Sequence, residues 1–218
     1  LLNPLDAPRT YLDETCRYLR NKWNPANAAP GTVVMIIRFG KIQAGPVTNP
    51  NGINVWDFMK TMQELKFQGF EALTMKEFLF FIERNAKIPP RSVLIIQDGN
   101  FEGEYFYRNY REFWENWGWP VVNGWLSDFE TPENLRLENF NMENEGWVDH
   151  QAHGVIPETK LSDESAKTVI ARELQGSLDG FARQFGKTPI AFIWPNGGIG
   201  LRPVTAARLL GYQLGFTA

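Results

Sequence analysis

The sequence predicts an α/β fold in which helices alternate with the strands of a mostly parallel sheet. Two apolar runs of strand length, at 33–37 and 92–97, flank a segment of helical period at 55–67. Pro and Gly lie between these segments, as is usual at the boundaries of βα units. Such alternation is typical of a parallel sheet, either open or closed into a barrel. A length of 218 residues favours a single domain spanning 1–218.

One apolar face predicts the helix at 54–67, and Gly69 ends it. The residues on this face recur at three- and four-residue spacing: Val55, Phe58, Met59, Met62 and Leu65. Four further apolar runs are predicted strands: 121–125, 147–152, 190–194 and 212–216.

A second long helix is expected to begin at Ser162. Asp163 and Glu164 would then lie in its first turn, where carboxylates suit the positive end of the helix dipole. Its apolar side would consist of Val169, Leu174, Leu178 and Phe181. The stretch 127–146, rich in Asn and Glu, is expected to be a long surface insertion.

Composition and charge exclude several classes of function. The hydrophobic content of 43% and charged content of 22% are those of an ordinary globular protein. A net charge of −3 and a pI near 5.5 provide no basic stripe for nucleic acid. No apolar run approaches the roughly 20 residues that cross a bilayer. The single cysteine, Cys16, cannot form an internal disulfide, and we expect a buried structural thiol.

Chemically distinctive residues follow three of the predicted strands. Asp98 follows the strand at 92–97, and His150 and His153 lie at the end of the strand at 147–152. Trp194, Pro195 and Asn196 follow the apolar run that starts at residue 190. Loops at the carboxyl ends of parallel strands converge on one face, so we expect these residues to share a pocket.

Residues 89–99, Pro-Pro-Arg-Ser-Val-Leu-Ile-Ile-Gln-Asp-Gly, resemble the polysaccharide deacetylase family of carbohydrate esterases. In that family, Pro-Pro-Lys-Ser leads into a strand ending in Thr-Phe-Asp-Asp-Gly. Four more stretches resemble family segments and follow one another in the same order: 33–42, 65–70, 193–197 and 209–217. The stretch 193–197 is similar to the biofilm-polysaccharide branch of the family. The resemblance covers most of the chain from Val33 onward, and residues 1–32 are expected to form an N-terminal helical extension.

The resemblance implies a distorted (β/α)7-type barrel of mostly parallel strands. In the family, an Asp and two His hold a divalent metal, which would be Zn, Co or Ni. A second Asp acts as general base on the metal-bound water, and the products are an amine and acetate. The implied substrate is an acetylated polysaccharide or oligosaccharide, and the implied location is extracellular or in the cell envelope.

Transferred residue by residue, the family's site is incomplete in this chain. Asp98 matches the metal-binding Asp, but the general base falls on Gln97, whose neutral amide accepts no proton at useful pH. His153 matches the first metal-binding His. The position of the second His is Pro157, which has no ligand atom.

Two residues are candidates for the third metal ligand. Glu158 would take this place if one more residue separated the two ligands, and its carboxylate oxygen suits a divalent metal. His150 is the other candidate, but on a strand its odd spacing from His153 points the two side chains to opposite faces. Both histidines therefore have a structural interpretation as well.

The remaining family features are altered too. Trp194, Pro195 and Asn196 lie where the family usually has its Arg-Pro-Pro-Tyr motif, and no Arg is present. The motif that supplies the general acid would follow Thr217, so we expect the chain to be truncated at its C-terminus. Together with Trp125, the residues 194–196 are predicted to bind substrate, because flat aromatic rings stack on sugars.

Three functions remain open from the sequence. The first is a degenerate deacetylase-like domain, a pseudoenzyme that binds an acetylated polysaccharide. The second is an active, divergent metal-dependent N-deacetylase or esterase, and the third is a non-catalytic scaffold domain. Losing a general base typically costs about 10²–10⁴-fold in rate, and losing a metal ligand weakens the binding of the ion. The first function, the degenerate domain, is therefore favoured. The sequence does not indicate an oligomeric state.

Overall fold

The computed structural model describes residues 8–22, 24–47, 51–157 and 159–217. Its main sheet has seven strands, and every pair in it is parallel. Six of them form a row in the order β1-β5-β6-β7-β8-β9, and β4 pairs beside β5. The strands are β1 (Val33–Phe39), β4 (Glu71–Ala72), β5 (Arg91–Asp98), β6 (Val121–Trp125), β7 (Val148–Ala152), β8 (Ala191–Ile193) and β9 (Leu214–Phe216).

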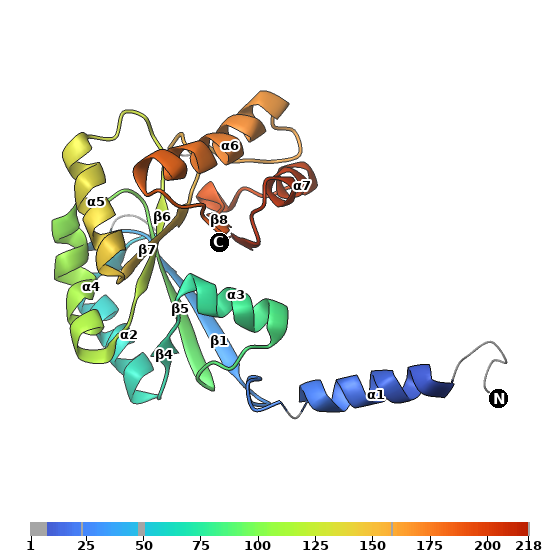
Figure 1. The fold of residues 1–218 in the computed structure, drawn as a ribbon. Helices are drawn as coiled ribbons and strands as arrows, with labels where there is room; N and C mark the ends of the chain where they lie inside the picture. The colour runs from blue at the N-terminus through green and yellow to red at the C-terminus, as the bar shows by residue number, and fades with distance from the viewer. Residues whose placement is uncertain (1–7, 23, 48–50, 158, 218) are drawn as a thin grey trace.

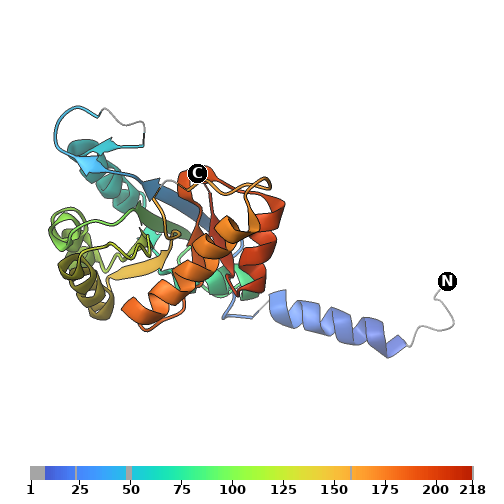
Figure 2. The ribbon, with the colours of Figure 1, turned by 90° about the horizontal axis from the view of Figure 1, so that it is seen from above.

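The row of strands curls into a half-barrel whose two ends are β1 and β9 (Figures 1 and 2). Six helices belong to this body: α2 (Val55–Phe67), α3 (Met75–Arg84), α4 (Gly103–Trp117), α5 (Glu133–Glu145), α6 (Lys167–Gln184) and α7 (Leu201–Leu209). A 3-10 turn (Pro195–Gly197) and a small sheet of β2 (Ile42–Gln43) and β3 (Ile53–Asn54) complete it. This architecture confirms the predicted α/β fold with a distorted, parallel (β/α) barrel.

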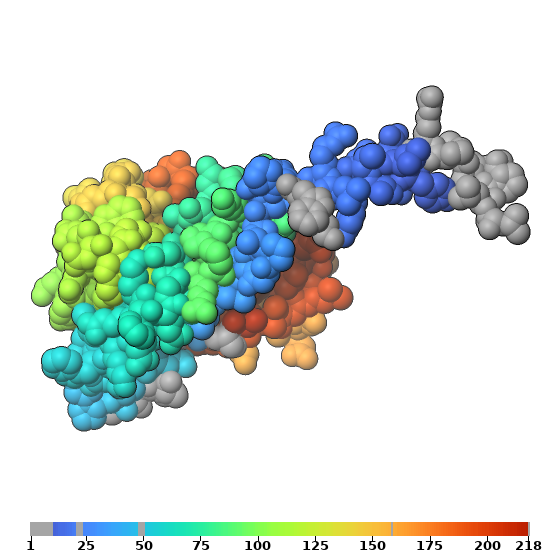
Figure 3. Space-filling view, turned by 90° about the horizontal axis from the view of Figure 1, so that it is seen from below, coloured from blue at the N-terminus to red at the C-terminus, as the bar shows by residue number. Residues whose placement is uncertain are grey.

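The helix α1 (Pro8–Lys22) extends away from the body (Figures 1 and 3). The side chains of residues 11–20 are exposed, including Cys16. The expected buried thiol is therefore wrong, because this helix does not pack on a core. Within the described residues, no helix combines the length and apolar character needed to span a membrane.

The alternation of side chains along β5 determines what faces the barrel interior. Leu94 and Ile96 belong to an interior cluster with residues of β6, β8 and β9, whereas Val93 and Ile95 pack under α2 and α4. Since side chains on a strand alternate between its two faces, residue 98 continues the interior row. Residue 97 continues the row that faces the helices.

Two elements were predicted to the residue. The strand at 121–125 is β6, and the helix α2 covers 55–67 with Asn54 as its N-cap. The Asn54 side chain accepts a hydrogen bond from the Trp56 backbone N–H, which satisfies one of the free donors of the first turn.

The helix expected from Ser162 begins instead at Lys167. The Ser162 backbone N–H donates to Ser165 Oγ at 2.9 Å, and Ser162 Oγ accepts from the Glu164 N–H at 3.2 Å. Short polar side chains that bond to nearby backbone in this way compete with helix formation. Asp163 accepts from the Arg202 N–H at the start of α7, so its carboxylate serves another helix.

The expected surface insertion at 127–146 is wrong, because most of it is the helix α5. Its inward side includes Met142 and Asn139, both fully buried. Asn139 Nδ2 donates to the backbone oxygens of Phe101 and Leu135, which allows an amide to be buried there. This polar inward face hides the apolar period on which a helix prediction depends.

Candidate active site

Asp98 and His153 meet at the carboxyl end of the barrel strands. Asp98 is the last residue of β5, and His153 directly follows β7. The distance between Asp98 Oδ1 and His153 Nε2 is 2.8 Å. The His153 backbone N–H donates to the Trp125 carbonyl, and its Nδ1 donates to the Ile193 carbonyl at 2.8 Å. The backbones of β6 and β8 therefore fix the imidazole with Nε2 toward Asp98.

Arg38 of β1 is a third member of this site. It lies opposite Ile96 of β5 in the parallel ladder, and its Nη1 forms an ion pair with Asp98 Oδ2. Both side chains are largely buried, with 22% and 15% exposed. Sequence reasoning missed Arg38, although a charged residue near the carboxyl end of an apolar strand was the same signal that identified Asp98.

These two neighbours determine the charge state of Asp98. Burial raises the pKa of the carboxyl group, but His153 and Arg38 together outweigh burial and hold the pKa below its usual value. The carboxylate is therefore ionised at neutral pH.

The fit of a divalent metal can be judged from the atoms that face one another here. Asp98 Oδ1 is buried and has no aligned hydrogen bond in the described part of the chain, despite its short distance to His153 Nε2. These two atoms are suited to be metal ligands. Catalytic zinc sites, however, have three protein ligands, and the described residues contain no group of three His, Cys, Asp or Glu that could hold an ion. The Arg38 guanidinium adds a positive charge that opposes a cation, so the described residues do not complete a metal site.

The candidates for a third ligand do not join this pair in the described structure. Glu158 lies outside the residues that the structure describes. His150 is fully buried, and its ring stacks on Phe185. Its Nδ1 lies 2.9 Å from Glu143 Oε2, and its Nε2 lies 2.9 Å from Asn139 Oδ1, so neighbours on α5 occupy both ring nitrogens.

Gln97, at the family's general-base position, is fully buried on the other side of β5. Its Oε1 accepts hydrogen bonds from the hydroxyls of Tyr105 at 3.1 Å and Tyr110 at 2.7 Å. Its Nε2 donates to the carbonyls of Phe39 at 3.2 Å and Gly40 at 2.5 Å. Burial raises the pKa of Tyr105 to about 12, so this hydroxyl remains a donor. Both ends of the Gln97 amide are thus engaged in hydrogen bonds beneath α4, and this side chain does not face the Asp98 carboxylate.

The predicted substrate-binding residues are mostly buried. Trp125 is 0% and Trp194 is 3% exposed, and both pack in the cluster between the sheet and α6. Pro195 is also buried, and only Asn196, with a left-handed φ of 51°, is exposed. The structure therefore does not provide the stacking surface expected from these two tryptophans.

The fold has close counterparts among solved structures. Streptococcus pyogenes deacetylase PplD, solved in complex with acetate, has 20% sequence identity and a TM-score of 0.73 over 85% of this chain and 83% of that chain. A de-N-acetylase from Aggregatibacter actinomycetemcomitans has 15% identity and a TM-score of 0.70 over 84% and 87% of the two chains. A polysaccharide deacetylase from Bacillus cereus has 17% identity and a TM-score of 0.69 over 85% and 57%.

No protein-family model matches the sequence, and no curated protein matches it. The chain therefore has the fold of the polysaccharide deacetylases, and this likeness to distant structures defines its fold alone.

Proposed function

We propose that this domain is a degenerate polysaccharide deacetylase that binds acetylated polysaccharide at the barrel rim and does not hydrolyse it. The observation that carries the proposal is the pairing of Asp98 with Arg38 and His153, while Gln97 lies in the core. The Asp98 carboxylate is then engaged by two partners, and residue 97 supplies no base. The deacetylase fold of the structural neighbours supports a carbohydrate ligand, and we propose a cell-envelope or extracellular location.

The chemistry at the rim supports binding over hydrolysis. Amide hydrolysis requires activated water and a proton acceptor, and the Asp98 carboxylate is held by the Arg38 guanidinium. A sugar's acetamide or hydroxyl oxygen can instead accept from the unused donors of Arg38, since a guanidinium has five and Asp98 engages Nη1.

One observation favours an active metal-dependent N-deacetylase as the second candidate. Asp98 Oδ1 and His153 Nε2 face one another without an aligned hydrogen bond, as two ligands of one ion would. Glu158 would supply the third ligand in this alternative.

Metal titration and an acetate-release assay separate the two candidates. The protein is incubated with Zn²⁺ or Co²⁺, bound metal is counted after gel filtration, and acetate release from tetra-N-acetylchitotetraose is measured. The proposal predicts no stoichiometric metal and no acetate, with saccharide-induced NMR shifts at Arg38 and Asp98. One ion per chain and acetate release, both lost in Asp98→Ala but retained in the exposed control Asp13→Ala, would establish the enzyme instead.

A further inference from the structure

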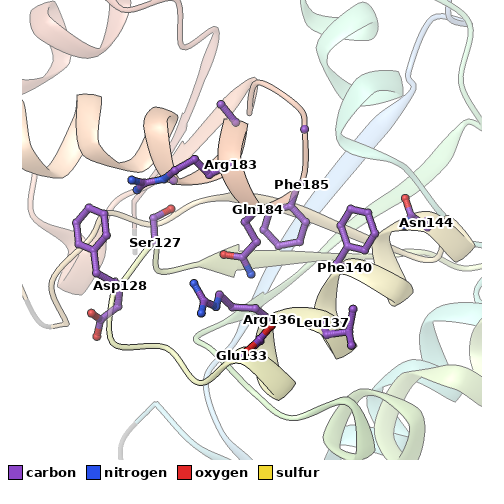
Figure 4. Close-up of a pocket in the computed structure, with 14 residues that line it drawn as sticks. Ser127, Asp128, Glu133, Arg136, Leu137, Phe140, Asn144, Arg183, Gln184 and Phe185 are labelled. Atoms are coloured by element: carbon purple, nitrogen blue, oxygen red, sulfur yellow. The ribbon is translucent and has the colours of Figure 1, made fainter.

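A cleft of about 880 Å³ lies outside the barrel, between α5 and the C-terminal end of α6 (Figure 4). The loop after β6 forms its third wall. This volume lies within the range of about 300–1,000 Å³ that is typical of small-molecule sites. None of the residues that line it belongs to the rim cluster of Arg38, Asp98 and His153.

Two hydrogen-bond donors lack acceptors at this cleft. Gln184 Oε1 accepts from Trp125 Nε1 at 3.2 Å, which fixes the amide so that Nε2 is left without a partner in the described residues. Arg136 forms no ion pair within the described part of the chain. Figure 4 shows Arg136 from α5 and Gln184 from α6 pointing toward one another across the cleft. Gln184 Nε2 is itself buried beneath the lining, so Arg136 is the donor of the two that a ligand oxygen in the cleft reaches directly.

The charges of the lining offset one another. Arg136 and Arg183 are balanced by Asp128 and Glu133. Neither Glu133 nor Arg183 forms an ion pair in the described structure. Carboxylates only accept and guanidinium groups only donate, whereas a hydroxyl group does both. A polyhydroxylated, uncharged ligand therefore matches this lining better than an ion of either sign.

An exposed aromatic ring borders the same cleft. Phe129 is 63% exposed, and the Arg183 guanidinium lies 4.8 Å from its ring centroid. The face of an aromatic ring suits the C–H face of a sugar, and Phe129 offers such a ring in the lining of the cleft.

From these observations we propose that the α5–α6 cleft is a second binding site, which takes an uncharged saccharide. The inference goes beyond the rim function, because the cleft is built from different residues and requires no feature of Asp98. An oxygen atom of the sugar would accept from Arg136, hydroxyl groups would donate to Asp128 or Glu133, and one ring would lie on Phe129.

An NMR titration of the full chain with tetra-N-acetylchitotetraose and cellotetraose tests this inference. Backbone shifts are expected at 127–129 and 183–186 with at least one probe. Phe129→Ala should weaken binding roughly three- to tenfold, the equivalent of one aromatic contact. Arg136→Met should have a similar effect through lost hydrogen bonds, roughly three- to tenfold.

Matched controls separate the cleft from the rim. Phe67→Ala removes another exposed aromatic ring, and Arg208→Met another exposed arginine, and both should bind like the parent chain. Asp98→Ala should change the rim shifts and leave the cleft shifts in place. The inference is overturned if neither probe shifts the cleft residues, even if the rim responds. It is also overturned if only anionic tetragalacturonate binds there.

Discussion

Arg38 on β1 and Asp98 on β5 form an ion pair across two adjacent parallel strands. The pair lies at the rim of the barrel, where the His153 side chain also contacts Asp98. A protein cation thus lies against the carboxylate that the family resemblance assigns to a metal. The Arg38 guanidinium therefore occupies one oxygen of that carboxylate.

Replacing Arg38 by Met should destabilise the fold. Asp98 would lose its guanidinium partner and keep only His153 beside it, while only 15% of its side chain is exposed. We expect a loss of about 1–2 kcal/mol in the free energy of unfolding, between the values for exposed and buried pairs. Urea denaturation measures it, and Arg208→Met should stay within about 0.5 kcal/mol of the parent. Additive losses in Arg38→Met, Asp98→Asn and the double variant would contradict a direct pair.

Removal of the Arg38 charge should also raise the affinity for metal. With Arg38→Ser, both carboxylate oxygens of Asp98 become available beside His153 Nε2. The loss of one adjacent positive charge should strengthen Zn²⁺ binding at least about tenfold. The measurement is the shift in unfolding temperature that added Zn²⁺ causes in each protein. Equal shifts in parent and variant would show that Arg38 does not oppose an ion.

Restoring an acid at residue 97 should not restore hydrolysis. In Gln97→Glu, the tyrosine hydroxyls can still donate to one oxygen, but the other would face the carbonyls of Phe39 and Gly40. We expect no acetate release and a loss of about 2–4 kcal/mol in stability, from an unmatched buried polar group. The exposed substitution Gln63→Glu is the control. Acetate release by the Gln97→Glu variant would mean that residue 97 reaches the rim.

Acidification should destabilise the protein through His150. Burial lowers the pKa of His150, and Lys187 acts in the same direction, against Glu143 and Asp149. In the unfolded chain the histidine has its ordinary pKa of 6.5 and binds a proton more readily than in the fold. The free energy of unfolding therefore falls as the pH drops below 6.5. Unfolding temperatures between pH 8 and pH 5 test this.

The variant His150→Gln removes the titrating group, so its unfolding temperature should fall less over the same range. The carboxyl groups of Asp98 and Glu143 have lowered pKa values in the fold, so their stabilisation is lost only at lower pH. Identical pH profiles for parent and variant would assign the effect to other groups.

Local patterns predicted much of the fold. Apolar periodicity located β6 and α2 to the residue, and the rule that strand ends converge brought Asp98 and His153 together. Both signals lie within a few neighbouring residues of the chain, so a single sequence contains them.

Other features depend on distant parts of the chain. The Arg38–Asp98 pair requires β1 to lie beside β5, 60 residues apart in sequence, in one particular register. The burial of Trp125 and Trp194 depends on which face of the curled sheet α6 covers. Neither relationship appears in local spacing, so the sequence pattern indicated neither the role of Arg38 nor the burial of the two tryptophans.

Residues 97 and 98 are sequence neighbours on opposite faces, one saturated by hydroxyl groups and carbonyls and the other ionised. Sliding β5 by a single position against β1 would exchange them, forcing a charged group between Phe39 and Tyr110 and an amide against Arg38. The mismatch penalises that slipped pairing severely, so residues 97 and 98 help to fix the register of β5 against β1.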